Sequence, residues 1–202
     1  MARANTLRQR ATSAAGTRQR ILDAGRDLLI NDGLNAANIS AIAAHAGVTR
    51  GTVYMHFASP HELLLAVLND ALDRADVRFI RKALHHPDAA EAARLLMAGS
   101  TRFWVAERYV FSRIKGLAMV DAEFARLDEL KEAARAGHTR NLAIRLVQQR
   151  RLRAGVSELD AYNTIFFLCS FEAVEHCTRV AGLSVQATAL QLRRILDTTV
   201  LA

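Results

Sequence analysis

Residues 38–57 read as two short helices joined at a glycine, and this pattern strongly limits how that part of the chain can fold. Asn38 can cap the first helix, because its side-chain oxygen can accept a hydrogen bond from a backbone N–H of the first turn. Gly47 favours the left-handed backbone that ends a helix, and Val48 can pack between the two helices. Thr49 can cap the second helix. The pattern predicts a helix-turn-helix.

The helical repeat predicts which side chains of this segment face inward. In the first helix the apolar residues recur at spacings of three and four, at Ile39, Ile42, Ala43 and Ala46. In the second helix Val53 and Phe57 are four apart and face the same way. Gly51 costs about 1 kcal/mol relative to alanine inside a helix. Close approach of the backbone to a phosphate group would explain a glycine there.

The full run from Ala46 to Phe57, followed by Leu63, resembles the DNA-binding module of TetR-type (tetracycline repressor family) transcriptional regulators. The resemblance covers about residues 17–68. It implies an all-α fold, with an N-terminal three-helix helix-turn-helix domain and a C-terminal helical domain for ligand binding and dimerisation. A glycine-bounded pair of helices can also be a simple corner of a helical protein, and the full run is what favours the DNA-binding interpretation.

The resemblance also implies which side chains contact double-stranded DNA. The second short helix would lie in the major groove with Arg50 as the base reader, because a guanidinium can donate two hydrogen bonds to guanine. Met55 could pack on a thymine methyl group, while Tyr54 and His56 occupy positions that resemble phosphate contacts. His56 could instead be a packed core histidine. The DNA-binding candidates are Ser40, Thr49, Arg50, Gly51, Thr52, Tyr54, Met55 and His56.

At Pro60 the chain departs from the family pattern, which usually has a lysine that binds a phosphate there. The net charge of +7 is a weak signal for a polyanionic partner, but its distribution is more informative. Residues 1–16 contain arginines and no acidic residue, a composition that predicts a flexible, disordered basic arm. We expect this arm to compensate for Pro60 by contacting DNA. A solvated tail is the alternative.

Composition predicts helices throughout, because the 202 residues include only two prolines and few β-branched runs. We expect a flexible basic arm at 1–16, a helix-turn-helix DNA-binding domain at 17–62, and a helical effector-binding and dimerisation domain at 63–202. No apolar run reaches the length of a membrane span, and the N-terminus lacks the apolar stretch of a signal peptide. These features favour a cytoplasmic protein without a membrane partner.

Capping residues and apolar periodicity predict the helices of the chain. The expected ranges outside the helix-turn-helix are 17–32, 60–84, 88–106, 110–117, 121–155, 158–181 and 185–200, with Gly137 as a possible kink. The helices 158–181 and 185–200 carry more apolar surface than a lone pair can bury, including Phe166 and Phe167. This predicts a homodimer through a four-helix bundle, as the resemblance also implies. A helix buried within one chain is the alternative.

The resemblance implies that the central helices enclose a small-molecule effector of unknown identity, which releases a repressor from a palindromic operator. Aromatic, soft or polar residues on those helices are the pocket candidates: Met97, Phe103, Trp104, Phe111, His138, Leu142, Phe166 and Cys169. Such residues are also common in ordinary helical cores. Few acids are expected near these positions, which favours a hydrophobic or weakly anionic ligand.

Other functional classes find less support in the sequence. No catalytic signature, glycine-rich phosphate loop or zinc-protease motif is present, so we expect no enzyme activity and no cofactor. A metal-responsive regulator is one alternative, because Cys169, Glu172 and His176 would share a face of one helix. A fourth ligand is not apparent, so a metal is not our first expectation. A repressor that needs no ligand is another alternative.

Overall fold

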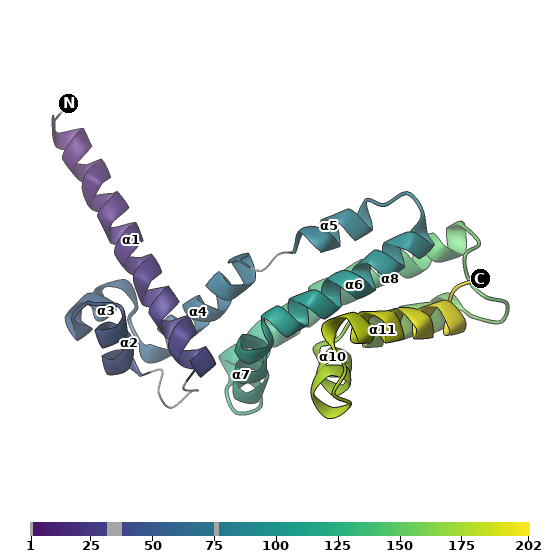
Figure 1. The fold of residues 1–202 in the computed structure, drawn as a ribbon. Coiled ribbons are helices and arrows are strands. Elements are labelled where there is room, and N and C mark those ends of the chain that lie inside the picture. The colour runs from purple at the N-terminus through teal and green to yellow at the C-terminus, as the bar shows by residue number, and fades with distance from the viewer. Residues whose placement is uncertain (1, 32–37, 75–76) are drawn as a thin grey trace.

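The computed structural model describes the backbone of residues 2–31, 38–74 and 77–202, and their side chains except at 2–13 and 72–74. Every element within this part of the chain is a helix (Figure 1), which confirms the predicted all-α fold. The helices are α1 (Ala2–Asn31), α2 (Ile39–His45), α3 (Arg50–His56), α4 (Pro60–Arg74), α5 (Arg78–Leu84), α6 (Ala89–Ala106), α7 (Arg108–Ala118), α8 (Ala122–Gln148), α9 (Glu158–Leu168), α10 (Phe171–Glu175), the π-helix η1 (His176–Val180) and α11 (Val185–Thr199).

Helices α1 to α3 and the first half of α4 surround a small hydrophobic core. Its fully buried side chains include Ile21, Leu22, Leu29, Ile42, Val53, Phe57 and Leu63. Gly25 allows α1 and α4 to pack closely, because a Cβ atom at Gly25 would lie 2.8 Å from Cγ2 of Val67. This core fixes the position of α3 relative to its support helices.

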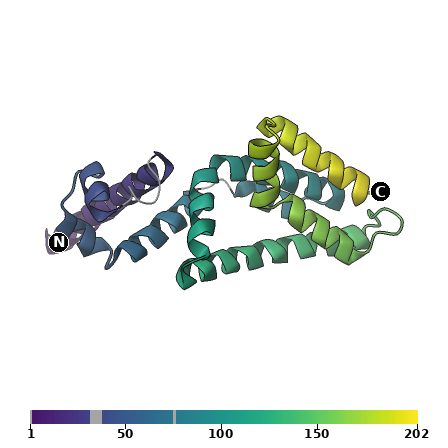
Figure 2. The same cartoon turned by 90° about the horizontal axis from the view of Figure 1, so that it is seen from below.

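A larger core begins at Leu68 in the second half of α4 and continues to Leu201. Helix α8 packs along α7 and α9, while α6 packs along α5 and α11. Figures 1 and 2 both place α1 to α3 at one end of the molecule and α11 at the other. We expected the second domain to begin at residue 63, but Leu63 and Val67 belong to the first core. The border between the cores therefore falls inside α4.

The structure contradicts the expected flexible arm, since residues 2–16 continue α1 as a helix. Alanine, arginine, leucine and glutamine are strong helix formers, and no proline interrupts this segment. Figure 1 shows that this end of α1 extends away from the rest of the molecule. The side chains of Arg3, Arg8 and Arg10 lie outside the described residues.

The single helix expected over residues 60–84 is instead two helices, α4 and α5. Tertiary contact accounts for the second helix, because α5 lies along α6 with Phe79 over Gly99. A Cβ atom at Gly99 would lie 2.6 Å from the Cβ of Phe79, so the two helices meet at the backbone of Gly99. The predicted end before Pro87 is confirmed.

The long helix expected over residues 121–155 ends at Gln148, and it runs through Gly137 as one element. After Gln148 the chain makes hydrogen bonds to other parts of the molecule instead of continuing the helix. The Gln149 amide oxygen accepts from the backbone N–H of Ala89 at 2.8 Å. The Arg153 N–H donates to the Val200 carbonyl at 2.9 Å, which ties this loop to the end of the chain.

The helix expected over residues 158–181 is also interrupted, between Leu168 and Phe171. Ser170 starts α10 as a new cap, because its hydroxyl accepts from the Ala173 N–H at 3.1 Å. The indole N–H of Trp104 donates to the Cys169 carbonyl at 2.8 Å. A buried partner on α6 therefore satisfies a carbonyl that a continuous helix would have used itself.

Candidate nucleic-acid interface and ligand cavity

Local capping interactions form the turn between α2 and α3. The Asn38 side chain accepts from the Ala41 N–H at 3.0 Å, and the Thr49 hydroxyl accepts from the Thr52 N–H at 3.1 Å. Gly47 has a φ of 66°, the left-handed conformation expected for it. The predicted caps and turn are confirmed.

Seven of the DNA-binding candidates lie on α3 or at its cap, Ser40 lies on α2, and most of the eight are exposed. The exposed ones are Ser40, Thr49, Arg50, Gly51, Tyr54 and Met55. The side chain of Met55 is 77% exposed, although methionine is a hydrophobic residue. Thr52 and His56 are half-buried, and the Thr52 hydroxyl lies 2.9 Å from that of Thr49. The outer face of α3 thus presents the cation of Arg50, the phenol of Tyr54 and the apolar side chain of Met55. Gly51, next to Arg50, adds no side chain to this face.

The start of α4 follows α3 after three residues. The Ser59 hydroxyl accepts from the Glu62 N–H at 3.0 Å, and the Glu62 carboxylate accepts from the Ala58 N–H at 2.6 Å. The Glu62 carboxylate thus bonds the backbone of the residue before the capping residue Ser59. Pro60 is exposed as the first residue of the helix.

Ion pairs of Arg26 and His61 join the first core to the second. Arg26 of α1 donates to Glu107 at 2.7 Å, and Glu107 lies at the corner between α6 and α7. His61 at the start of α4 lies 3.2 Å from Asp121 and 2.7 Å from Glu123, at the start of α8. The hydrogen bond with His61 lowers the pKa of the Asp121 carboxyl group. A movement of helices in the second core can therefore act on α1 through Arg26 and on α4 through His61.

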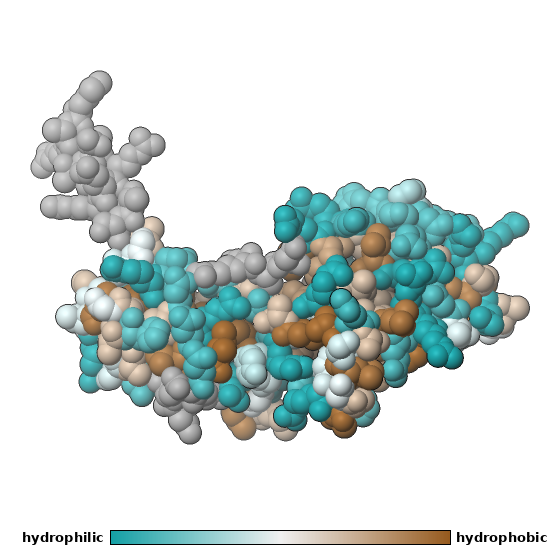
Figure 3. All heavy atoms as spheres, in the orientation of Figure 1, coloured by the Kyte–Doolittle hydropathy of each residue, from teal (hydrophilic) through white to brown (hydrophobic). Residues whose placement is uncertain are grey.

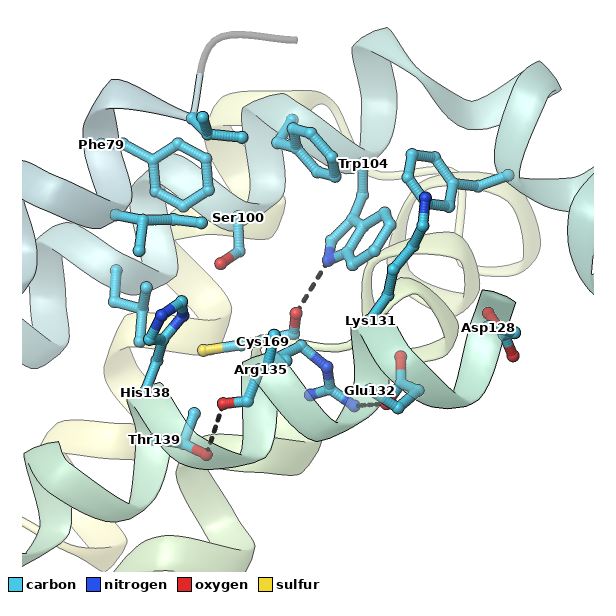
Figure 4. A pocket seen from close by; sticks show the side chains of 16 residues that line it. Phe79, Ser100, Trp104, Asp128, Lys131, Glu132, Arg135, His138, Thr139 and Cys169 are labelled. Atoms are coloured by element: carbon cyan, nitrogen blue, oxygen red, sulfur yellow. Dashed lines mark hydrogen bonds and ion pairs between the residues drawn. The ribbon is translucent and has the colours of Figure 1, made fainter. Parts of the chain in front are cut away.

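A cavity of about 190 Å³ lies between α5, α6, α7 and α8 (Figure 4). One wall is apolar and comes from α5, α6 and α7, with Phe79, Ile80, Leu96, Phe103, Trp104 and Phe111. The opposite wall comes from α8 and contains Asp128, Lys131, Glu132, Arg135, His138 and Thr139. Ser100 and Cys169 lie near His138 (Figure 4), and Val77 and Ala134 complete the lining.

The structure separates the pocket candidates into two groups. Those that line the cavity are Phe103, Trp104, Phe111, His138 and Cys169. Met97 and Leu142 are fully buried core residues, and Phe166 lies outside the cavity with the Arg135 guanidinium 3.5 Å from its ring centre. Helical spacing cannot distinguish these cases, because all of them face inward and only the packing of neighbouring helices decides where space remains.

Sequence reasoning missed the polar wall on α8. Asp128, Lys131, Glu132 and Arg135 recur at spacings of three and four, so periodicity could have revealed a shared face. The expectation of few acids near the pocket was wrong. These acids are paired, since Asp128 lies 3.5 Å from Lys115 and Glu132 accepts from Arg135.

The structure does not favour the metal-responsive alternative. The break at Ser170 removes the common helix face, and Glu172 pairs with Lys115 at 3.0 Å. Cys169 is buried, which raises the pKa of its thiol to about 12 and disfavours the thiolate form that binds metals. Within the part of the chain that the structure describes, no three His, Cys, Asp or Glu residues are placed to hold a metal ion.

The family described as bacterial regulatory proteins, tetR family, matches residues 21–67, which run from α1 into α4. Residues 21–67 therefore match a DNA-binding domain of the TetR family. The HTH-type transcriptional regulator SrpR of Pseudomonas putida is 48% identical over 61 residues, which are 30% of this chain and 29% of that protein. The HTH-type transcriptional repressor BepR of Brucella suis biovar 1 (strain 1330) is 34% identical over 65 residues, 32% of this chain and 31% of that protein. These matches span less than a third of either relative.

A solved structure shares the fold beyond the TetR-family domain. A putative transcriptional regulator from Saccharomonospora viridis, crystallised in complex with choline, matches with a TM-score of 0.72 at 19% identity. The match covers 93% of this chain and 99% of that chain, so both domains have the same arrangement. Among the helices that the structure describes here, none is long and apolar enough to cross a membrane.

Proposed function

We propose that this TetR-family chain is a sequence-specific DNA-binding transcriptional regulator, most simply a repressor that a small-molecule effector releases from a palindromic operator. The exposed face of α3 carries the proposal, because Arg50 is exposed there and Met55 is 77% exposed on a helix that a compact core holds in place. A major groove admits such a helix, and arginine is the usual reader of guanine.

The proposed DNA contacts divide by chemistry. Arg50 reads base edges, and Met55 packs against a thymine methyl group. Ser40, Thr49, Thr52, Tyr54 and His56 position the domain on phosphates, and Gly51 allows the backbone to approach them. Residues 1–16 contact DNA beside the domain, and residues 2–16 of this segment do so as part of α1 rather than as a flexible arm. Such a regulator works where the bacterial chromosome lies, in the cytoplasm.

We further propose a homodimer through α9, η1 and α11. Four large apolar side chains on these helices are more than 60% exposed in one chain: Leu159, Phe167, Val180 and Leu190. Figure 3 shows hydrophobic side chains at the surface over α10 and the adjoining part of α11. A second copy would cover this surface, and its two-fold axis would present two α3 helices to successive major grooves.

The cavity is the proposed effector site. The neighbour bound to choline supports a ligand site in this fold. Backbone hydrogen bonds link the cavity to the DNA-binding domain, because the Glu107 N–H donates to Phe103 and the Glu107 carbonyl accepts from Phe111. Both partners line the cavity, and the Glu107 side chain binds Arg26 of α1. A ligand that moves the aromatic wall would thereby shift α1, provided it binds the two arrangements unequally.

Selection of bound sequences from a random DNA library tests the proposal. The full chain should enrich one palindromic site, and the Arg50→Ala variant should lose that preference. Failure to enrich any sequence at moderate salt would contradict a sequence-specific regulator. Enrichment without symmetry would retain the DNA-binding function and reject the dimer.

A further inference from the structure

We propose that the cavity takes an uncharged, one-ring aromatic molecule with a single hydrogen-bonding group. The inference rests on the proposed function only in treating the cavity as the effector site. Its size, its aromatic wall, its charge balance and its polar end each limit the ligand independently.

The size of the cavity limits the ligand to about one ring. The cavity holds about 190 Å³. An apolar protein cavity of about 150 Å³ accommodates benzene, whereas drug-sized ligands occupy roughly 300 to 1,000 Å³. The volume inside the cavity therefore matches a benzene ring with a few further heavy atoms.

The apolar wall favours a flat aromatic ring. The Trp104 ring lies 4.8 Å from that of Phe103 and 4.7 Å from that of Phe111, and both pairs are edge-to-face. Phe79 extends the same wall, with its ring 6.1 Å from that of Phe103. Aromatic rings attract one another in offset or edge-to-face arrangements, so a further ring can join this cluster.

The charged groups of the opposite wall disfavour an ion. Asp128 and Glu132 balance Lys131 and Arg135 in number, and the carboxylates already have cationic partners. Arg135 donates to Glu132 and also to the Phe166 carbonyl. A charged ligand would lose its hydration, and a cation could pair with Asp128 or Glu132, or an anion with Arg135, only by breaking one of these pairs. A neutral ligand avoids both costs.

One end of the cavity can bind a hydroxyl group. Figure 4 shows Ser100, His138 and Cys169 directed toward the same end, away from Trp104. Ser100 is 6% exposed and Cys169 is 2% exposed, so both are buried polar side chains of the cavity lining. A hydroxyl can both donate and accept, and an imidazole offers the complementary roles. A ligand with its ring on the aromatic wall could place its hydroxyl here.

Three probes of nearly equal shape test the inference: benzyl alcohol, benzoate and benzylammonium, each titrated into the full chain by calorimetry at pH 7. Benzyl alcohol should bind at least about tenfold more tightly than either ion, a difference of about 1.4 kcal/mol. Tighter binding of benzoate or benzylammonium would overturn the inference, and so would failure of all three probes to bind.

A pair of variants on α8 locates the binding. Ala134 is exposed and lines the cavity, so Ala134→Phe should fill it and abolish benzyl alcohol binding without disturbing the core. Ala133→Phe is the matched control, because Ala133 is exposed on the same helix outside the lining. Equal binding by both variants would overturn the inference. DNA selection by the same protein is measured separately, so a chain that selects DNA but rejects benzyl alcohol refutes the ligand class alone.

Discussion

Arg50 is the residue on which the proposed base readout depends most. Its side chain is exposed at the start of α3, and no other residue of that helix can donate two parallel hydrogen bonds to guanine. The neighbouring Gly51 places no Cβ atom between the helix and a phosphate. Adjacent residues therefore have the two proposed roles: Arg50 reads a base, and Gly51 lets the backbone approach a phosphate.

The Arg50→Ala variant should bind its selected site roughly 5- to 150-fold more weakly, since a bidentate arginine–guanine contact is worth about 1 to 3 kcal/mol. The thermal midpoint should stay unchanged, because the side chain is exposed. Fluorescence anisotropy on the selected site measures the loss. Arg102→Ala is the control, as Arg102 is exposed on α6, and equal losses in both variants would refute a specific role for Arg50.

Two glycines in helices should respond to alanine in opposite directions. A Cβ atom at Gly99 would lie 2.6 Å from the Phe79 Cβ, so Gly99→Ala should lower the free energy of unfolding by about 1 to 3 kcal/mol. At Gly137 nothing lies within 4 Å, so Gly137→Ala should raise it by about 0.5 to 1 kcal/mol. Urea unfolding of both variants decides this, and a stable Gly99→Ala protein would show that α5 does not need its close contact with α6.

Local signals predicted the caps, and tertiary contacts account for what the sequence did not show. Each of three caps accepts a hydrogen bond from a backbone N–H three residues later: Asn38, Thr49 and Ser157. Such a role can therefore be predicted from the adjacent sequence. The restart of the chain at Ser170 is accompanied by a bond from Trp104, 65 residues away from Cys169. The cavity is similarly non-local, because its two walls come from different helices.

At the scale of helices, the corner between α6 and α7 connects the cavity to α1. Glu107 is 8% exposed and is bonded through its backbone to the cavity residues Phe103 and Phe111. Its carboxylate is the partner of Arg26. Glu107 thus contacts both the apolar wall of the cavity and α1, the support helix of the helix-turn-helix.

The Glu107→Gln variant should weaken the response to the ligand while leaving ligand affinity unchanged. Glutamine keeps the shape of glutamate but loses the charge that holds Arg26, so the ligand-induced change in operator affinity should fall at least about threefold. Parallel titrations with DNA and with ligand measure the two effects. Asp197→Asn is the control, because the Arg94–Asp197 pair lies between α6 and α11, away from the DNA-binding domain. A full response in Glu107→Gln would exclude this route.

At the scale of the whole molecule, dimerisation decides whether two α3 helices act together. Phe167 is 63% exposed and Leu190 is 68% exposed. Burying either side chain in an interface would stabilise the dimer by about 1.5 to 3 kcal/mol. Both lie on the helices that the sequence already indicated as a dimer surface. The sequence predicted an excess of apolar side chains on these helices, but only the structure shows which of them are exposed.

A Phe167→Arg, Leu190→Arg double variant should sediment as a monomer, because four buried charges would replace the apolar side chains of the interface. Analytical ultracentrifugation at micromolar concentration measures the change. Met119→Arg serves as the control, since Met119 is 86% exposed at the turn between α7 and α8. A double variant that remained dimeric would move the interface to another surface.

The most direct test of the account is a footprint and a stoichiometric titration of the full chain on its selected DNA site. Two α3 helices related by a two-fold axis predict two chains per site and two protected half-sites about 34 to 36 Å apart, one helical turn of DNA. Protection should disappear in the Arg50→Ala variant and recede when the cavity ligand is added. One chain per site, or protection that Arg50→Ala leaves intact, would contradict the account.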